Sequence, residues 1–326
     1  MDWINATLVV DVLGKPAWVW LLFVGIVLTL LVFDLGVLQK RMRTIGVRQS
    51  LMLSAFYISA GLLFGAWIWV TQGATSGMEY LTGFFIEKSL SLDNVFVISL
   101  IFAHFAVPAA YQHRVLFWGI LGVIVLRAIM IGLGTAIVQN FDWVLYIFGA
   151  FLVFTGLKML SPTGHVQDVA DSRLLRFLRR HMRVTDTYHG NRFFVRLKDA
   201  NTGQMASYAT PLFLALLMVE GADLVFAVDS VPAIFAITTD PYIVYTSNIF
   251  AILGLRALYF ALAAMVHRFY ALKYALALVL VFIGGKIFWN QIIGKLDPAI
   301  SLTVTLALIV GGILFSLARP TSASKA

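Results

Sequence analysis

The sequence predicts an all-α polytopic membrane protein with about nine transmembrane helices. The 326-residue chain is 60% hydrophobic and only 12% charged, whereas a soluble domain carries about 25% charged residues. Its apolar residues gather in runs that are long enough to cross a bilayer, which takes about 20 residues in a helix. The loops between these runs alternate between basic and neutral, which is typical of membrane proteins.

Nine apolar segments account for most of the chain. The residues before the first one have no basic region, so no removable signal peptide is expected. The chain contains no cysteine, so disulfides, thiolate metal sites and thiol redox chemistry are excluded. The predicted segments are 17–38, 51–71, 80–103, 115–137, 143–160, 209–237, 243–266, 274–293 and 299–318.

The basic residues predict the orientation of the chain in the membrane, because cytoplasmic loops are enriched in lysine and arginine. The loop after the first segment is basic, the next has no base, and this alternation continues to the C-terminus. We therefore expect an integral protein of a bacterial inner membrane, with its N-terminus outside and its C-terminus cytoplasmic. The net charge of +8 is assigned to these loops and not to nucleic-acid binding. The bases that mark the first and last cytoplasmic loops are Lys40, Arg41, Arg43, Arg48, Arg319 and Lys325.

Five regions follow from this reading: the first two helices (1–72), a first repeat (73–160), a basic connection (161–208), a second repeat (209–293), and the last helix with its tail (294–326). In the connection, helical periodicity places Leu174, Phe177 and Leu178 on one face and most arginines elsewhere. Such a helix lies on an anionic lipid surface or is a solvated positive-inside signal. The residues after it predict a hairpin that turns at 201–203.

Two copies of one acidic motif interrupt the apolar segments. Residues 87–95 read E-K-S-L-S-L-D-N-V, and residues 223–231 read D-L-V-F-A-V-D-S-V. A carboxylate at the bilayer centre costs roughly 2.5–3.5 kcal/mol, so the five acids would cost on the order of 12–18 kcal/mol if nothing neutralised them. The acids and the polar residues that follow them are Glu87, Asp93, Asn94, Glu220, Asp223, Asp229 and Ser230.

The repeat extends beyond the acids. L-R-A around Arg127 returns around Arg256. V-F-T-G-L-K, which ends at Lys158, returns as V-F-I-G-G-K, which ends at Lys286, in the same order and at nearly the same spacing. The repeat unit contains three segments, an odd number, so the second copy must cross the membrane in the opposite direction. This is the inverted-repeat plan of secondary transporters, in which the site lies near the midplane.

The spacing of the acids predicts a local interruption of the helix. Residues six apart on a straight helix lie about 120° out of alignment, so Glu87 and Asp93 share a face only if the helix unwinds between them. In the second copy Pro232 follows Asp229 and frees a carbonyl one turn earlier. Freed carbonyls and carboxylates together form a cation site.

A structural alternative stays open, in which the acids only form buried ion pairs with Arg127, Arg256, Lys158 and Lys286. As a transport site, the acids would be ligands or proton carriers, with Arg127, Arg256 and Lys286 balancing charge when the site is empty. Asp34 ends the first segment near the interface. It is either a solvated acid or an access residue on the ion's path.

The available ligands are oxygens, because every histidine lies in or beside a predicted cytoplasmic connection. Oxygen sites suit manganese, calcium and magnesium, whereas zinc, copper and nickel favour nitrogen and sulfur. A buried carboxylate can also exchange a proton for a cation. No nucleophile, metalloprotease or phosphate-binding motif is present, so no enzyme and no prosthetic group are expected.

The motifs resemble those of the TerC (tellurium-resistance C) family of integral membrane proteins, and within it the Alx-type manganese exporters. The resemblance spans nearly the whole chain, from F-D-L-G-V-L at Asp34 to the ninth segment. Its most specific parts are E-K-S-L-S-L-D-N-V-F-V, A-T-P-L-F-L-A-L-L-M-V-E, D-L-V-F-A-V-D-S-V-P-A-I and S-N-I-F-A-I-L-G-L-R-A-L-Y. It implies a lysine-exporter-like fold, manganese export, calcium as a second cargo, and a role in metal homeostasis under alkaline or metal stress.

We therefore expect a transporter that exports a divalent cation, most of all Mn²⁺, with protons as the candidate coupling ion. The acids of both motifs would bind it. Two alternatives remain at this point: a membrane scaffold or assembly factor that acts through the basic 161–208 connection, and a calcium or proton carrier. The sequence does not fix transport direction, stoichiometry or oligomeric state.

Overall fold

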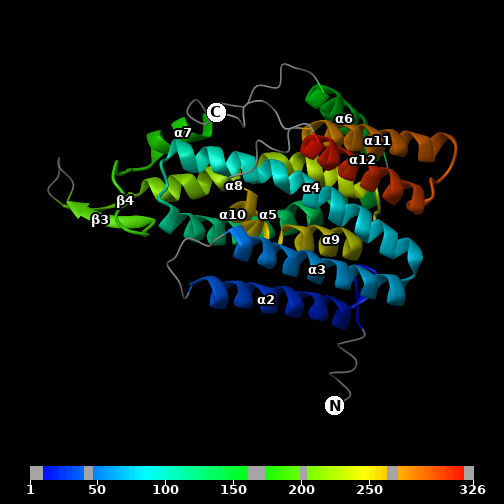
Figure 1. Cartoon of the computed structure of the whole chain (residues 1–326), viewed down its shortest axis with the longest axis horizontal. Helices are drawn as coiled ribbons and strands as arrows, with labels where there is room; N and C mark the ends of the chain where they lie inside the picture. Colours follow the sequence, from blue (N-terminus) through cyan, green and yellow to red (C-terminus); the bar gives the residue numbers. More distant parts are fainter. Residues whose placement is uncertain are drawn as a thin grey trace, which may run out of the picture.

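The computed structural model describes residues 10–39, 47–141, 143–160, 173–198, 204–262 and 271–318. These residues form a helical bundle with two small antiparallel strand pairs. Figure 1 shows the long helices running along the long axis of the bundle, with α7 and the β3–β4 hairpin at one end. The elements are β1 (Asp11–Val12), β2 (Lys15–Pro16), α2 (Ala17–Gln39), α3 (Val47–Gln72), α4 (Ala74–His104), α5 (Ala109–Asn140), α6 (Val144–Leu160), α7 (Arg173–His181), β3 (Phe194–Lys198), β4 (Met205–Ala209), α8 (Pro211–Phe235), α9 (Pro241–Ile252), α10 (Leu255–Leu262), α11 (Leu272–Ile292) and α12 (Pro298–Ala318).

Proline and aspartate mark where several helices begin. Pro211, Pro241 and Pro298 open α8, α9 and α12, where the missing N–H costs no hydrogen bond because the first turn has no partner for it. The Asp240 carboxylate accepts a hydrogen bond of 2.9 Å from the Tyr242 N–H and so caps α9.

Seven helices of the described residues are long and apolar enough to cross a membrane, which confirms a polytopic membrane protein. They correspond to α2, α3, α5, α8, α9 with α10, α11 and α12. Two of the predicted segments fall outside this set. The α6 helix has only 17 residues, and α4 carries Glu79, Glu87, Lys88 and Asp93 within its 31 residues. Nine spans therefore remain a prediction.

Large apolar side chains cover much of the outer surface of the bundle. Leu63 and Val70 of α3 are 71% and 84% exposed, and Val32 of α2 is 66% exposed. A soluble monomer rarely exposes apolar surface on this scale, whereas a surface that faces lipid requires it. The exposed residues thus agree with the apolar composition in placing the bundle in a membrane.

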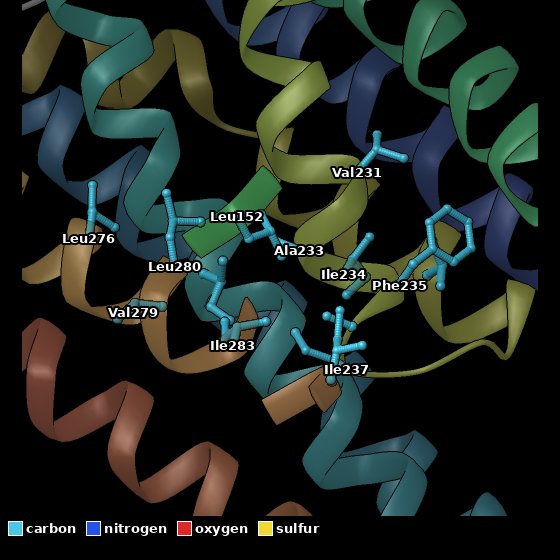
Figure 2. Packing of buried hydrophobic residues seen from close by; sticks show 14 of the residues in the cluster. Leu152, Val231, Ala233, Ile234, Phe235, Ile237, Leu276, Val279, Leu280 and Ile283 are labelled. Atoms are coloured by element: carbon cyan, nitrogen blue, oxygen red, sulfur yellow. The ribbon is translucent and has the colours of Figure 1, made fainter. Parts of the chain in front are cut away.

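Three clusters of buried apolar residues hold the bundle together. One joins α6, α8 and α11, and Figure 2 shows its members Leu152, Ile234 and Leu280 from those three helices. A second joins α4, α5, α8 and α10 near the end that carries α7, and a third joins α2, α3, α4 and α9. The polar residues of the predicted site lie on α4, α5 and α8, which all three clusters position.

The α6 and α11 helices pack closely because glycines let their backbones approach. A Cβ built on Gly284 would lie 2.7 Å from the Gly149 carbonyl oxygen, and one on Gly156 would lie 2.6 Å from the Ala277 carbonyl oxygen. As the residue number rises on one helix it falls on the other, so the two helices run antiparallel. Small residues permit such contacts between membrane helices.

The predicted hairpin in the 161–208 connection is confirmed. Phe194–Lys198 pairs antiparallel with Met205–Ala209, and the predicted turn at 201–203 lies outside the described residues. The predicted helix is α7, and two of the three residues predicted on its apolar face, Leu174 and Leu178, contact the bundle. Leu175 is buried at 3% exposure and packs on the bundle together with Leu178, whereas Phe177 is 57% exposed.

The predicted segment 243–266 is not one continuous helix. It is interrupted after Ile252, where Gly254 has a φ of +80° before α10 begins at Leu255. Glycine adopts this left-handed conformation without the steric cost that a side chain adds. A Cβ there would also lie 2.6 Å from Cβ of Tyr57 on α3. The interruption therefore depends on this glycine.

Two adjacent glycines of α11 offer a matched test of the α6–α11 packing. Both Gly284→Ala and Gly285→Ala should gain about 1 kcal/mol of helix propensity. Gly284→Ala should nevertheless destabilise the protein by about 1–3 kcal/mol, because the new methyl group overpacks the contact with Gly149. At Gly285 no atom lies within 4 Å of the built Cβ. Thermal unfolding of the two variants in detergent measures the difference, and equal midpoints would contradict the packing.

Candidate functional site

A buried arginine links the two acidic motifs. Arg127 of α5 has its Nη1 atom 2.7 Å from Oε1 of Glu87 on α4, and its Nη2 atom 3.6 Å from Oδ1 of Asp223 on α8. The three residues are between 1% and 5% exposed. A carboxylate in hydrocarbon is tolerated when it is paired, and a single guanidinium here serves two. The repeat-related acids Glu87 and Asp223 thus meet at one point.

The same guanidinium also binds two neutral residues. Its Nη1 atom donates to Oγ of Ser230 at 2.7 Å and to Oδ1 of Asn248 at 2.9 Å. These two bonds use both Nη1 hydrogens. Glu87 therefore makes a close ion pair with Nη1 but receives no aligned hydrogen bond, in agreement with the absence of a donor to its Oε1 among the described residues. Both Nη1 hydrogens of Arg127 are therefore in use, whereas Glu87 Oε1 still lacks a hydrogen-bond donor among the described residues.

Four buried oxygens on α4 and α8 have no hydrogen-bond donor within the part of the chain that the structure describes. Each is an acceptor that costs free energy when it is buried alone, roughly 1–3 kcal/mol and more if charged. They lie on the two motif helices, and Glu87 Oε1 is also paired with Arg127 at 2.7 Å. They are Glu87 Oε1, Asn94 Oδ1, Glu220 Oε2 and Asp223 Oδ2.

Beside this set lies a small cavity of about 20 Å³, bordered by Asn94 and Asp223. A volume of about 10–15 Å³ holds one water molecule, so the cavity has room for a particle of that size. The Asn94 amide donates to Oδ1 of Asp223 at 3.3 Å, which fixes the two side chains relative to each other. If Glu87, Glu220 and Asp223 are all ionised, they and Arg127 carry two net negative charges, which one divalent cation balances.

The expected unwinding of the motif helices is wrong. Both α4 and α8 are continuous through their motifs, and Pro232 lies within α8 without ending it. The hydroxyls of Ser89 and Ser91 donate to carbonyls one turn back, at 2.7 and 2.8 Å, which is compatible with an intact helix. The spacing argument overlooked that the two acids of a motif need not share one face.

Because the helices are continuous, the second acid of a motif points elsewhere. Asp229 faces α6, where the Thr155 hydroxyl lies 3.5 Å from its Oδ1 and Lys158 is the nearby cation. Glu220, one turn before Asp223, packs its carboxylate against Gly122 of α5. The side chain of Asp93 lies outside the described residues.

Asp34 is neither solvated nor part of the Arg127 cluster. It is 8% exposed and pairs with Arg256 of α10 at 2.7 Å, and Arg256 also donates to the Asp34 backbone carbonyl at 2.9 Å. Lys286 is buried on α11, and the acid that acts on it is Glu79 instead of a motif acid. Two of the three predicted charge-balancing residues therefore have other partners.

The described side chains bring no three acidic, histidine or cysteine residues together around one metal position. The structure unites Glu87, Asn94, Asp223 and Ser230 around Arg127, with Glu220 one turn away. It leaves Asp34, Asp229 and Lys286 apart from them. Arg127 lies between Glu87 and Asp223 in this arrangement.

Sequence reasoning missed two residues that complete the site. Asn248 of α9 is fully buried and binds Arg127. Lys88 of α4 donates to the carbonyls of Ala251 and Leu253, at 3.0 and 3.3 Å. These carbonyls lie where the chain is interrupted between α9 and α10, so the ammonium satisfies backbone groups that no helix continues. The sequence did contain one sign of this interruption, which is the glycine Gly254 in the middle of a predicted span.

Removal of the central cation should destabilise the protein. Arg127→Gln leaves Glu87 and Asp223 without their counter-charge, and breaking a buried pair in this way costs about 3–5 kcal/mol. Adding Glu87→Gln to Arg127→Gln removes one of the stranded charges and should recover part of the loss. Unfolding of the two variants in detergent tests this, and a double variant less stable than Arg127→Gln would contradict it.

Lys88→Met should lower the thermal midpoint of the purified protein, because two carbonyls at the α9–α10 interruption lose their donor. The expected cost is about 1–3 kcal/mol. Lys198→Met on exposed β3 is the matched control and should leave the midpoint unchanged. If both substitutions have the same effect, the bonds from Lys88 do not stabilise the interruption.

Comparison with known proteins identifies the family. Residues 72–324 match the model of the integral membrane protein TerC family. An uncharacterized membrane protein of Rickettsia bellii is 49% identical over 92% of this chain and 97% of its own length. An uncharacterized membrane protein of Myxococcus xanthus is 44% identical over 96% of this chain and 97% of its own length.

A relative of Escherichia coli K12 has a functional name. It is the putative membrane-bound redox modulator Alx, 46% identical over 92% of this chain and 94% of its own length. No solved structure matches the chain. The family model covers most of the chain, including both acidic motifs and the helices that carry Arg127 and Arg256. The chain belongs to the TerC family of integral membrane proteins.

Proposed function

We propose that the protein is a transporter that exports a divalent cation, most of all Mn²⁺, through the crossing of α4 and α8. The observation that carries this proposal is the group of four buried oxygens on these two helices that have no donor among the described residues. A structural ion pair has no need of such oxygens, because each one reduces stability. A cation that binds to them removes that cost.

The proposed architecture has nine spans, with α4 to α6 and α8 to α11 as two inverted repeats. Reciprocal contacts support it. When the two acidic motifs are aligned, Glu87 corresponds to Asp223 and Asn94 to Ser230. Asn94 contacts Asp223, and Glu87 meets Ser230 through Arg127. The acid of each motif is thus linked to the polar residue of the other motif. A pseudo-two-fold axis in the membrane plane produces such reciprocal contacts.

The α6–α11 contact obeys the same symmetry. When Lys158 is aligned with Lys286, Gly156 corresponds to Gly284 and Gly149 to Ala277. Gly156 packs on Ala277, and Gly284 packs on Gly149, at nearly equal separations of 2.6 and 2.7 Å from the built Cβ atoms. The antiparallel direction of these helices is what inverted repeats produce.

The oxygen ligands favour a hard cation. Carboxylates and an amide suit manganese, calcium and magnesium. Arg127 keeps the acids paired when no cation is bound, so cation and guanidinium compete for Glu87 and Asp223. Protons that neutralise the carboxylates are the proposed coupling ion. The orientation follows the basic loops, with the N-terminus outside a bacterial inner membrane and the C-terminus in the cytoplasm.

The name of the relative from E. coli, a putative redox modulator, fits this proposal indirectly. This chain has no cysteine and so performs no thiol exchange itself. Manganese is redox-active, so its export would alter the redox chemistry of the compartment that it leaves. The exposed Phe177 and the arginines of α7 are the proposed contact with anionic lipid.

Flux measured in proteoliposomes tests the proposal. Glu87→Gln and Asp223→Asn should each lower Mn²⁺ flux at least about tenfold, because the loss of one ligand worth about 1.4 kcal/mol is a factor of ten. Glu79→Gln, an acid on the same helix outside the cluster, should retain flux. Parallel assays with Ca²⁺, Mg²⁺ and an imposed pH gradient determine the cargo and the coupling.

An experiment in cells tests Asp93 and Asp229, the second acid of each motif. Asp93→Asn and Asp229→Asn variants at normal protein levels should accumulate manganese under manganese load, and wild-type intracellular manganese would contradict the proposal. Phe177→Ser in α7 should preserve export. If instead the α7 variant loses function and the acid variants do not, the protein is a scaffold.

A further inference from the structure

We propose that Arg256 is a second, alternating partner of the site acids, and that its guanidinium exchanges Asp34 for Asn94 and Asp223 at the edge of the cavity between them. The inference rests on the proposed transport function. It adds a second basic residue that binds the site acids.

The repeat predicts what Arg256 would bind. Arg256 corresponds to Arg127 when the two L-R-A sequences are aligned. Arg127 pairs with Glu87 and donates to Ser230. The residues that correspond to these two are Asp223 and Asn94, so an arginine in the equivalent position would pair with Asp223 and donate to Asn94.

Those two residues hold acceptors that are free to receive it. Asp223 Oδ2 and Asn94 Oδ1 are buried and have no donor among the described residues. Both residues border the cavity of about 20 Å³, and Arg256 borders it as well. The unpaired oxygens therefore lie where the repeat places the second guanidinium, and that arginine is already adjacent to them.

The space for the cavity also follows from the repeat. Arg127 has a third partner, Asn248, which corresponds to Gly119 of α5 in the same alignment. Gly119 borders the cavity and has no side chain to fill it. One half of the protein has an amide at this position, and the other half has open volume.

In this structure the Arg256 guanidinium is bound to Asp34. The Asp34 carboxylate is 2.7 Å from Arg256 Nη2, and the Asp34 carbonyl accepts a second bond of 2.9 Å from the same nitrogen. Arg127 and Arg256 thus differ in position despite their equivalent places in the repeat. One lies between the motif acids, and the other is bound to a helix outside the repeat.

The chain beside Arg256 is suited to movement. Arg256 is the second residue of α10, which begins directly after Gly254 with its φ of +80°. A short helix that follows a glycine can rotate with few changes of backbone angle. A guanidinium that binds Asp223 from the side of the cavity reduces the excess negative charge that the site acids carry in hydrocarbon.

A single introduced thiol tests the inference, because the chain has no cysteine of its own. Ala222 borders the cavity, so Ala222→Cys provides a reporter there. The measured quantity is the ratio of its labelling rates with a cationic and a neutral methanethiosulfonate of similar size, in purified metal-free protein. Variants at Asp34 and Arg256 are added to this background.

Asp34→Asn should lower the ratio at least about tenfold, because the released guanidinium repels the cationic reagent over a few ångströms. Asp34→Asn with Arg256→Gln should restore the parent ratio, and exposed Asp186→Asn should leave it unchanged. Asp34→Ser is a second variant that removes the same carboxylate. Only protein that elutes as one peak is compared.

An unchanged ratio in the Asp34 variants, or a low ratio that persists without Arg256, would overturn the inference. Simple loss of packing would change both reagents alike and leave their ratio constant. Protection of the thiol by Mn²⁺ is measured separately. Absent protection together with absent flux counts against the transport proposal, whereas the ratio reports on Arg256 without any metal.

Discussion

A single guanidinium shared by two carboxylates inside an apolar bundle is the constraint on which the rest of the structure depends. Arg127 compensates Glu87 and Asp223, and it does so from a helix that belongs to neither acid. Three helices must therefore stay in register for the charges to be neutralised. The apolar clusters around α4, α5 and α8 provide that register, since none of these helices could hold its own charge in hydrocarbon.

The pairing is incomplete in a chemical sense, because oxygens of the acids and the Nε donor of Arg127 both lack hydrogen-bond partners among the described residues. A fully satisfied network would be a rigid structural element with no affinity for a cation. The four oxygens that lack a hydrogen-bond donor among the described residues are the ones proposed to bind the cation. The same arrangement thus stabilises the fold through the ion pairs of Arg127. It also leaves buried oxygens without hydrogen-bond donors among the described residues.

Much of this was accessible from the sequence. Composition and loop charges predicted a helical membrane protein. The duplicated motif predicted that all five acids belong to one site, and the structure brings Glu87 and Asp223 together at Arg127. The position of Asp229 was not predicted, because a repeated spacing does not say which neighbour each face of a helix will contact. Asn248 and Lys88 were missed for a related reason. Their roles depend on the crossing of distant helices and on the interruption at Gly254, which no local pattern of polarity reveals.

The interruption at Gly254 also distinguishes the two proposed halves of the protein. The residue at the equivalent position of the first half is Val125, inside the continuous helix α5. A β-branched side chain strongly resists the left-handed backbone that Gly254 adopts. In the proposed two-repeat architecture, one half is therefore interrupted at this point and the other stays straight. Exchanging the two halves by genetic fusion would not reproduce the parent, even though their motifs align.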